Sequence, residues 1–143
     1  MGRVIAIDYG KKRTGIAVSD PLQMIAGGLA TVAAHEIIPF LKKYTEENEV
    51  ELILLGEPRQ MNYLYSENMD RVRQFHNLLH KSIPDIEIRY VDERFTSVLA
   101  HRAMLEGGLK RQKRRDKALV DEISATIILQ SWLESRNIKR VTN

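Results

Sequence analysis

The chain has 143 residues, of which 43% are hydrophobic, so it can fill the core of one domain spanning residues 1–143. No run approaches the roughly 18 apolar residues of a membrane span, and no signal peptide is recognisable, so we expect no membrane association. The absence of cysteine excludes disulfides and thiolate metal sites and makes a cytoplasmic location the simplest expectation. The formal net charge is +3, and its distribution is more informative than its size.

The first predicted element is a strand at residues 4–7, where four consecutive apolar residues indicate burial on both faces. The run ends at Asp8, whose charge would be costly to bury unless it were paired or bound to a metal. A basic turn and a second apolar run at residues 16–18 follow, which predicts a hairpin. Taken alone, Asp8 could equally be an ordinary turn residue.

Hydrophobic periodicity and turn residues predict the rest of the chain. In chain order we expect an edge strand at 28–32, a helix at 35–47, a buried strand at 50–55, a helix at 66–82, a strand at 86–91, a helix at 96–107 and a last helix at 118–136. The apolar side of the last helix is predicted to comprise Ile123, Ile127, Ile128 and Leu129. A narrower stripe with small residues, formed by Asp121, Ser124, Ala125 and Ile128, could approach a sheet closely.

Three strands in meander order, followed by alternating helices and strands, predict an α/β fold with a mixed five-stranded sheet flanked by helices. Ligands of such open sheets gather beyond the carboxyl ends of the strands. Carboxylates follow several of these ends, and another lies in the first turn of the last helix. These carboxylates are Asp8, Glu57, Asp92, Glu93 and Asp121. We therefore expect acidic groups that are distant in sequence to converge.

Carboxylates gathered in one cleft need compensating positive charge, and their hard oxygen atoms favour Mg²⁺ or Mn²⁺. Two such ions could activate water and stabilise the leaving oxygen of a phosphodiester. Six cations between Lys110 and Lys117 indicate a polyanionic partner such as nucleic acid, although a solvated loop would look similar. An acidic cleft with a basic rim is what a metal-dependent nuclease requires.

Four segments resemble motifs of the YqgF (RuvX) family, and together they span nearly the whole chain in the family's order. They are residues 6–18 (AIDYGKKRTGIAV), 56–62 (GEPRQMN), 91–97 (VDERFTS) and 117–125 (KALVDEISA). The resemblance implies an RNase H-like fold and a nuclease related to Holliday-junction resolvases. It also implies catalytic and metal-binding roles for Asp8, Glu93 and Asp121.

Two further carboxylates receive a lower rank as metal ligands. Glu57 stands where the family pattern leads us to expect an apolar residue, and it could equally be a surface residue. Asp92 should point to the other face from Glu93 if the strand continues. The cations expected to bind substrate phosphates are Lys11, Lys12, Arg13, Arg94, Lys110, Arg111, Lys113, Arg114, Arg115 and Lys117.

The resemblance implies maturation of the 5′ end of pre-16S ribosomal RNA and, as an alternative, resolution of four-way DNA junctions. Junction resolution usually needs a symmetric dimer, and no heptad run is evident, so the ribosomal role is favoured while monomer and dimer both stay open. A non-catalytic RNA-binding module is a third interpretation. The segment around Asp8 and Gly10 also resembles a phosphate motif of actin-like ATPases, but the chain lacks room for their second lobe.

Overall fold

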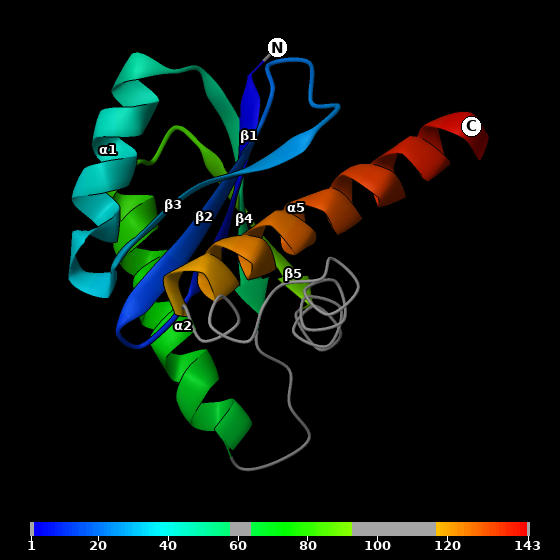
Figure 1. Cartoon of the computed structure of the whole chain (residues 1–143). Helices are drawn as coiled ribbons and strands as arrows, with labels where there is room; N and C mark the ends of the chain where they lie inside the picture. The colour runs from blue at the N-terminus through cyan, green and yellow to red at the C-terminus, as the bar shows by residue number, and fades with distance from the viewer. Residues whose placement is uncertain (1, 58–63, 93–116, 143) are drawn as a thin grey trace.

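The computed structural model describes residues 2–57, 64–92 and 117–142, which form a mixed sheet between two layers of helices (Figure 1). No helix within these ranges is long and apolar enough to cross a membrane. The strands are β1 (Arg3–Tyr9), β2 (Arg13–Ser19), β3 (Ala26–Ala33), β4 (Val50–Glu57) and β5 (Glu87–Asp92). The helices are α1 (Ile37–Glu47), preceded by the short 3-10 helix η1 (Ala34–Glu36), α2 (Leu64–Ser82) and α5 (Lys117–Thr142).

The strand order in the sheet is β3-β2-β1-β4-β5. The β1–β2 and β2–β3 pairs are antiparallel, whereas the β1–β4 and β4–β5 pairs are parallel. The predicted mixed five-stranded sheet, a meander followed by parallel strands, is confirmed. Since β1, β4 and β5 run in the same direction, their carboxyl ends meet at one edge of the sheet.

Each face of the sheet is covered by its own set of helices (Figure 1). Alternate residues of β1 divide between the faces, as the two-residue period of a strand requires. Ile5 and Ile7 pack in a core with residues of α1 and α2, whereas Val4 and Ala6 pack in a second core beneath α5. The central strands are therefore buried on both faces, which explains their continuous apolar runs.

Helix α5 departs from the sequence prediction in length and in its apolar side. It extends from Lys117 to Thr142, beyond the predicted end at residue 136. Ile128 and Leu129 are fully buried as predicted, but Ile123 and Ile127 are only half-buried and lie outside the core clusters. The buried positions follow one helical stripe, which continues to Leu133 and excludes these two isoleucines.

Candidate active site at the carboxyl end of β1

Asp8 lies one residue before the end of β1, on the face of the sheet that α5 covers. It follows Val4 and Ala6 at two-residue spacing, and both of these residues pack beneath α5. Its neighbour Tyr9 faces the other way and stacks on Phe75 of α2, with ring centroids 4.2 Å apart. Asp8 is half-buried, so the strand end holds its carboxylate between core and solvent.

The first turns of α5 lie directly on the strand that pairs with Asp8. In the antiparallel register of β1 and β2, Asp8 is opposite Gly15. A Cβ atom on Gly15 would overlap the carbonyl group of Asp121 and come within 3.0 Å of the Glu122 nitrogen. Only a glycine permits this close approach. Asp8 and Asp121, 113 residues apart in sequence, thus reach the same end of the same face of the sheet.

A second glycine allows the same turn of α5 to settle over the edge strand. A Cβ atom on Gly28 of β3 would overlap the carboxylate of Glu122. Gly15 and Gly28 together let α5 rest on the backbones of β2 and β3 near its beginning. The beginning of α5 is therefore packed on two strands, through its backbone at Gly15 and through the Glu122 side chain at Gly28.

Arg13 forms an ion pair with Asp121. The Nε atom of Arg13 donates a hydrogen bond to Oδ2 of Asp121 at 2.8 Å. The two side chains are 38% and 23% exposed, so the pair is partly screened from water. Sequence reasoning placed Arg13 among the phosphate-binding cations and missed this pairing, because a basic turn carries no signal about a helix more than 100 residues away. A positive charge thus already balances the Asp121 carboxylate.

The turn between β1 and β2 presents two further cations beside this pair. The main-chain nitrogen of Gly10 donates to the carbonyl oxygen of Arg13 at 2.9 Å, which closes the turn. The nitrogen of Ala34 donates to the carbonyl oxygen of Lys12 at 2.9 Å and ties the turn to the end of β3. Lys11 and Lys12 are exposed, so their ammonium groups can meet an anion at this edge.

Glu57 and Asp92 lie at the same edge of the sheet but on the opposite face from Asp8. They are partners in the parallel register of β4 and β5. Asp92 follows Tyr90 at two-residue spacing, and Tyr90 packs in the core beneath α1 and α2. Burial raises the pKa of the Tyr90 phenol, Arg73 opposes that rise and the negative charge of Glu57 adds to it. The sheet therefore lies between these two carboxylates and the pair formed by Asp8 and Asp121.

Several predicted site residues lie outside the described residues. They are Glu93, Arg94, Lys110, Arg111, Lys113, Arg114 and Arg115, together with the predicted helix at 96–107. Lys117 is described only as the first residue of α5. Within residues 2–57, 64–92 and 117–142, no group of three or more histidine or acidic side chains could hold a metal ion. Of the three predicted catalytic carboxylates, Asp8 and Asp121 lie at the same end of the sheet face beneath α5, and Glu93 lies outside the described residues.

Comparison with known proteins relates this arrangement to a family. The family model described as "RuvX: Holliday junction resolvase" matches residues 2–135. The chain is 62% identical to a protein of Phocaeicola vulgatus over 136 residues, which cover 95% of this chain and 98% of that protein. It is 56% identical to a protein of Porphyromonas gingivalis over 135 residues, 94% of this chain and 98% of that one. Both relatives bear the name "Putative pre-16S rRNA nuclease".

The fold has a counterpart among solved structures. It resembles T. thermophilus RuvC, solved in complex with a Holliday junction substrate, with a TM-score of 0.55 and 17% identity. The match covers 90% of this chain and 92% of that chain. The similarity of structure confirms the RNase H-like fold that the sequence motifs implied. The family match and the two relatives show that this chain belongs to the RuvX family.

Proposed function

We propose that this protein is a metal-dependent phosphodiester hydrolase that cleaves structured RNA during 5′-end processing of pre-16S ribosomal RNA. The names of its relatives and the family match support a nuclease. One structural observation carries the proposal: Asp8 and Asp121 lie at the same end of the sheet face beneath α5, brought there by the contact at Gly15. Two carboxylates that are distant in sequence thereby lie at one end of one face, which is what a shared site requires.

The residues present fit a hard divalent cation. Carboxylate oxygens of Asp8 and Asp121, together with Glu93, would hold Mg²⁺ or Mn²⁺. The ion pair with the Arg13 guanidinium supports this assignment, because the Asp121 carboxylate already faces a positive charge. When bound, such an ion supplies an activated water and charge stabilisation of the leaving oxygen.

The other residues of the site balance the acidic groups and hold the substrate. Arg13 neutralises the carboxylate of Asp121 through its hydrogen bond until a metal ion takes that place. Lys11 and Lys12, exposed on the neighbouring turn, bind phosphates of the RNA backbone. Arg94 and the cations of residues 110–117, which lie outside the part of the chain whose side chains are described, are further candidates for phosphate binding. The partner is accordingly a nucleic acid, and the site of action is the cytoplasm.

The test is incubation of the purified protein with precursor 16S ribosomal RNA in Mg²⁺, in Mn²⁺ and in chelator. We expect shortening at the 5′ end with either metal, none in chelator, and none with Asp8→Asn or Asp121→Asn. The matched control is Asp70→Asn, which removes an exposed carboxylate on α2 and should cleave as the wild type does. Metal-independent binding without cleavage by every variant would instead indicate a non-catalytic RNA-binding module.

The description of the matching family favours a second candidate, a Holliday junction resolvase. The same carboxylates and metal would then act on four-way DNA junctions. A synthetic four-way junction in the same three conditions separates the two candidates. Paired, symmetric cuts in the junction with intact precursor RNA would favour the resolvase, and the opposite result would favour the ribosomal role.

A further inference from the structure

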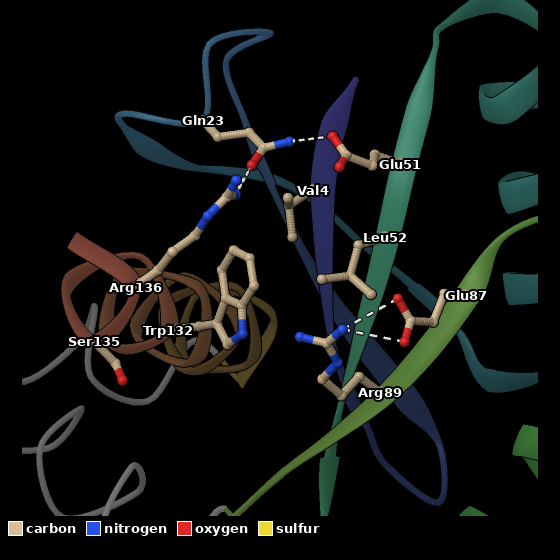
Figure 2. Close-up of a pocket in the computed structure, with 9 residues that line it drawn as sticks. All are labelled: Val4, Gln23, Glu51, Leu52, Glu87, Arg89, Trp132, Ser135 and Arg136. Carbon is tan, nitrogen blue, oxygen red and sulfur yellow. Dashed lines mark hydrogen bonds and ion pairs between the residues drawn. The ribbon is translucent and has the colours of Figure 1, made fainter. Parts of the chain in front are cut away.

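A cavity of about 330 Å³ lies at the amino ends of β1, β4 and β5, beneath the second half of α5 (Figure 2). Val4 and Leu52 of the strands and Trp132 of the helix line it. Asp121 and Trp132 are eleven residues apart, or about 16 Å along a helix with a rise of 1.5 Å per residue. The cavity is thus separate from the carboxylates at the other end of the sheet.

The cavity has an apolar floor and one aromatic wall. Val4 is fully buried and Leu52 is 5% exposed, and both belong to the core beneath α5. Trp132 is half-buried, packs against the same core and projects its indole ring toward the cavity (Figure 2). A flat apolar surface of this kind favours a planar ligand that can stack on the ring.

The polar groups around the cavity are held in place by hydrogen bonds. Gln23 is 6% exposed, and its Nε2 atom donates to the carbonyl oxygen of Gly2 at 2.7 Å and to Oε2 of Glu51 at 2.6 Å. The Oε1 atom of Gln23 accepts a hydrogen bond from Arg136. The Arg136 guanidinium also lies 5.3 Å from the centroid of the Trp132 ring. The buried glutamine therefore fixes a carboxylate and a guanidinium at one end of the cavity.

A second carboxylate and a second guanidinium stand at the other end. The Nη2 atom of Arg89 donates to both carboxylate oxygens of Glu87 at 3.1 Å. Its remaining donors are arranged in the planar fork of a guanidinium, which matches paired acceptors. Figure 2 shows the Arg89 guanidinium and the Glu51 carboxylate toward opposite ends of the cavity.

The formal charges of the cavity sum to zero, because two arginines and two glutamates line it. A balanced lining of this kind favours neither a bare polyanion nor a metal ion. It suits a neutral ring that accepts hydrogen bonds on one edge and donates them on another. The volume is at the lower end of the range for small-molecule sites, about 300–1,000 Å³, which limits the ligand to roughly one nucleoside.

Guanine is the base that satisfies these constraints. Its O6 and N7 atoms accept a pair of hydrogen bonds from an arginine fork. Its N1–H and N2–H groups form a pair of donors from which a carboxylate can accept hydrogen bonds.

We propose that this cavity binds a guanine base, which stacks on Trp132 and forms hydrogen bonds with Arg89 and Glu51. The base comes from an unpaired position of an RNA strand or from a free nucleotide, since a paired guanine could not enter. Binding here does not depend on cleavage at Asp8.

The chain contains a single tryptophan and five tyrosines, so emission excited beyond the tyrosine absorption band comes from Trp132 in this cavity alone. The experiment titrates the full chain with GMP in chelator and follows Trp132 emission. We expect saturable quenching by GMP and at least tenfold weaker binding of AMP. Inosine monophosphate, which lacks the N2 amino group, and 7-methyl-GMP, which blocks N7, should each bind weakly. Equal binding of GMP and AMP, or no saturable quenching, would overturn the proposal.

Two variants test whether Arg89 and Glu51 contribute to GMP binding. Arg89→Met and Glu51→Gln change exposed residues, so they should fold normally, and each should weaken GMP binding at least tenfold. The matched controls are Arg73→Met on α2 and Glu46→Gln on α1, which should leave it unchanged. Unaltered GMP affinity in both cavity variants would overturn the assignment.

A third ligand distinguishes the two sources of guanine. A uridine-rich single strand with one guanosine is titrated beside GMP, with an all-uridine strand as its control. Tenfold tighter binding of the guanosine strand than of GMP identifies RNA as the source, whereas equal affinity identifies the free nucleotide. If the guanosine and all-uridine strands bind alike while GMP does not quench, the cavity does not recognise guanine. If the wild-type protein binds GMP but does not cleave precursor RNA, the result counts against the proposed nuclease and leaves the guanine site standing.

Discussion

The carbonyl group of Asp121 rests on the α-carbon of Gly15, the residue opposite Asp8 in the β1–β2 register. This contact places the beginning of α5 on β2, beside the carboxyl end of β1. The side chain of Asp121 is held on the same side by Arg13 at 2.8 Å. The proximity of the two carboxylates therefore depends on a backbone contact that any side chain at residue 15 would prevent.

Gly15→Ala should move α5 away from β2. The added Cβ would overlap main-chain atoms that cannot rotate away, and overpacking of this kind costs about 1–3 kcal/mol. We expect a lower free energy of unfolding in a urea titration and reduced cleavage of precursor RNA. The control is Gly27→Ala on β3, whose Cβ would have the Val18 oxygen as its nearest neighbour at 4.0 Å. Equal stability of the two variants would show that α5 does not pack this closely on Gly15.

Arg13→Gln should change metal binding more than it changes stability. Partly exposed ion pairs contribute about 0–1 kcal/mol, so the melting temperature in chelator should fall little. The metal concentration for half-maximal stabilisation should decrease, because a cation no longer competes with the guanidinium for Asp121. The matched control is Arg73→Gln, which breaks an exposed pair with Asp70 on α2. A weaker metal response in Arg13→Gln would mean that Arg13 chiefly orients the carboxylate for the metal.

Lys11 and Lys12 should contribute to RNA affinity through phosphate contacts. Replacing one of them by glutamine should reduce the slope of log affinity against log salt by about 0.7–0.9, the value for one lost phosphate contact. The measurement is fluorescence anisotropy of labelled RNA at several salt concentrations in chelator. Lys42→Gln and Lys43→Gln on α1, equally exposed, are the controls. An unchanged slope in both turn variants would remove this turn from the binding surface.

Asp20 should make stability depend on pH through the loop that presents Gln23. Its Oδ1 atom accepts hydrogen bonds from the main-chain nitrogens of Met24 at 2.7 Å and Ile25 at 2.9 Å. The hydrogen bonds from Ile25 and Met24 lower the pKa of the Asp20 carboxyl below its usual 3.8. The charged carboxylate stabilises the folded state at pH values above the pKa that Asp20 has in the unfolded chain. This stabilisation is lost as the pH falls through the lower pKa that Asp20 has in the folded state. The melting-temperature difference between wild type and Asp20→Asn should therefore shrink below pH 3.8. A difference that grows on acidification would contradict this assignment.

The sequence predicted the sheet and the edge at which Asp8 lies, because apolar runs and strand-end carboxylates are local signals. The run at residues 4–7 indicated burial on both faces, and Asp8 at its end indicated the edge. The small residues near Asp121 correctly indicated a close approach of the last helix to the sheet, since Ala125 is fully buried there. The partner strand, marked by Gly15, could be identified only from the fold, because a glycine after a basic turn also fits an ordinary hairpin.

Two features that depend on the exact placement of α5 were not predictable. Ile123 and Ile127 look like core residues by hydropathy, but the stripe of α5 that meets the sheet passes beside them. Gln23 gave no signal, although it is buried with φ of 58° and joins Gly2, Glu51 and Arg136. A lone polar residue in a turn is expected to be exposed, and only the fold shows that α5 lies over Gln23. The role of Glu93 stays a prediction of the sequence motif.

Melting temperature tests most directly whether Asp8 and Asp121 form one cation-binding site. Wild type, Asp8→Asn and Asp70→Asn are melted in chelator and in excess Mg²⁺. Binding to the folded state stabilises it by about 2.7 kcal/mol at a hundredfold excess over the dissociation constant. We predict that Mg²⁺ raises the melting temperature of wild type and Asp70→Asn clearly more than that of Asp8→Asn. In chelator, Asp8→Asn should melt no lower than wild type, because it removes a charge placed for function. A clearly lower melting temperature of Asp8→Asn in chelator, with equal Mg²⁺ shifts in all three proteins, would make Asp8 a structural residue and contradict the shared site.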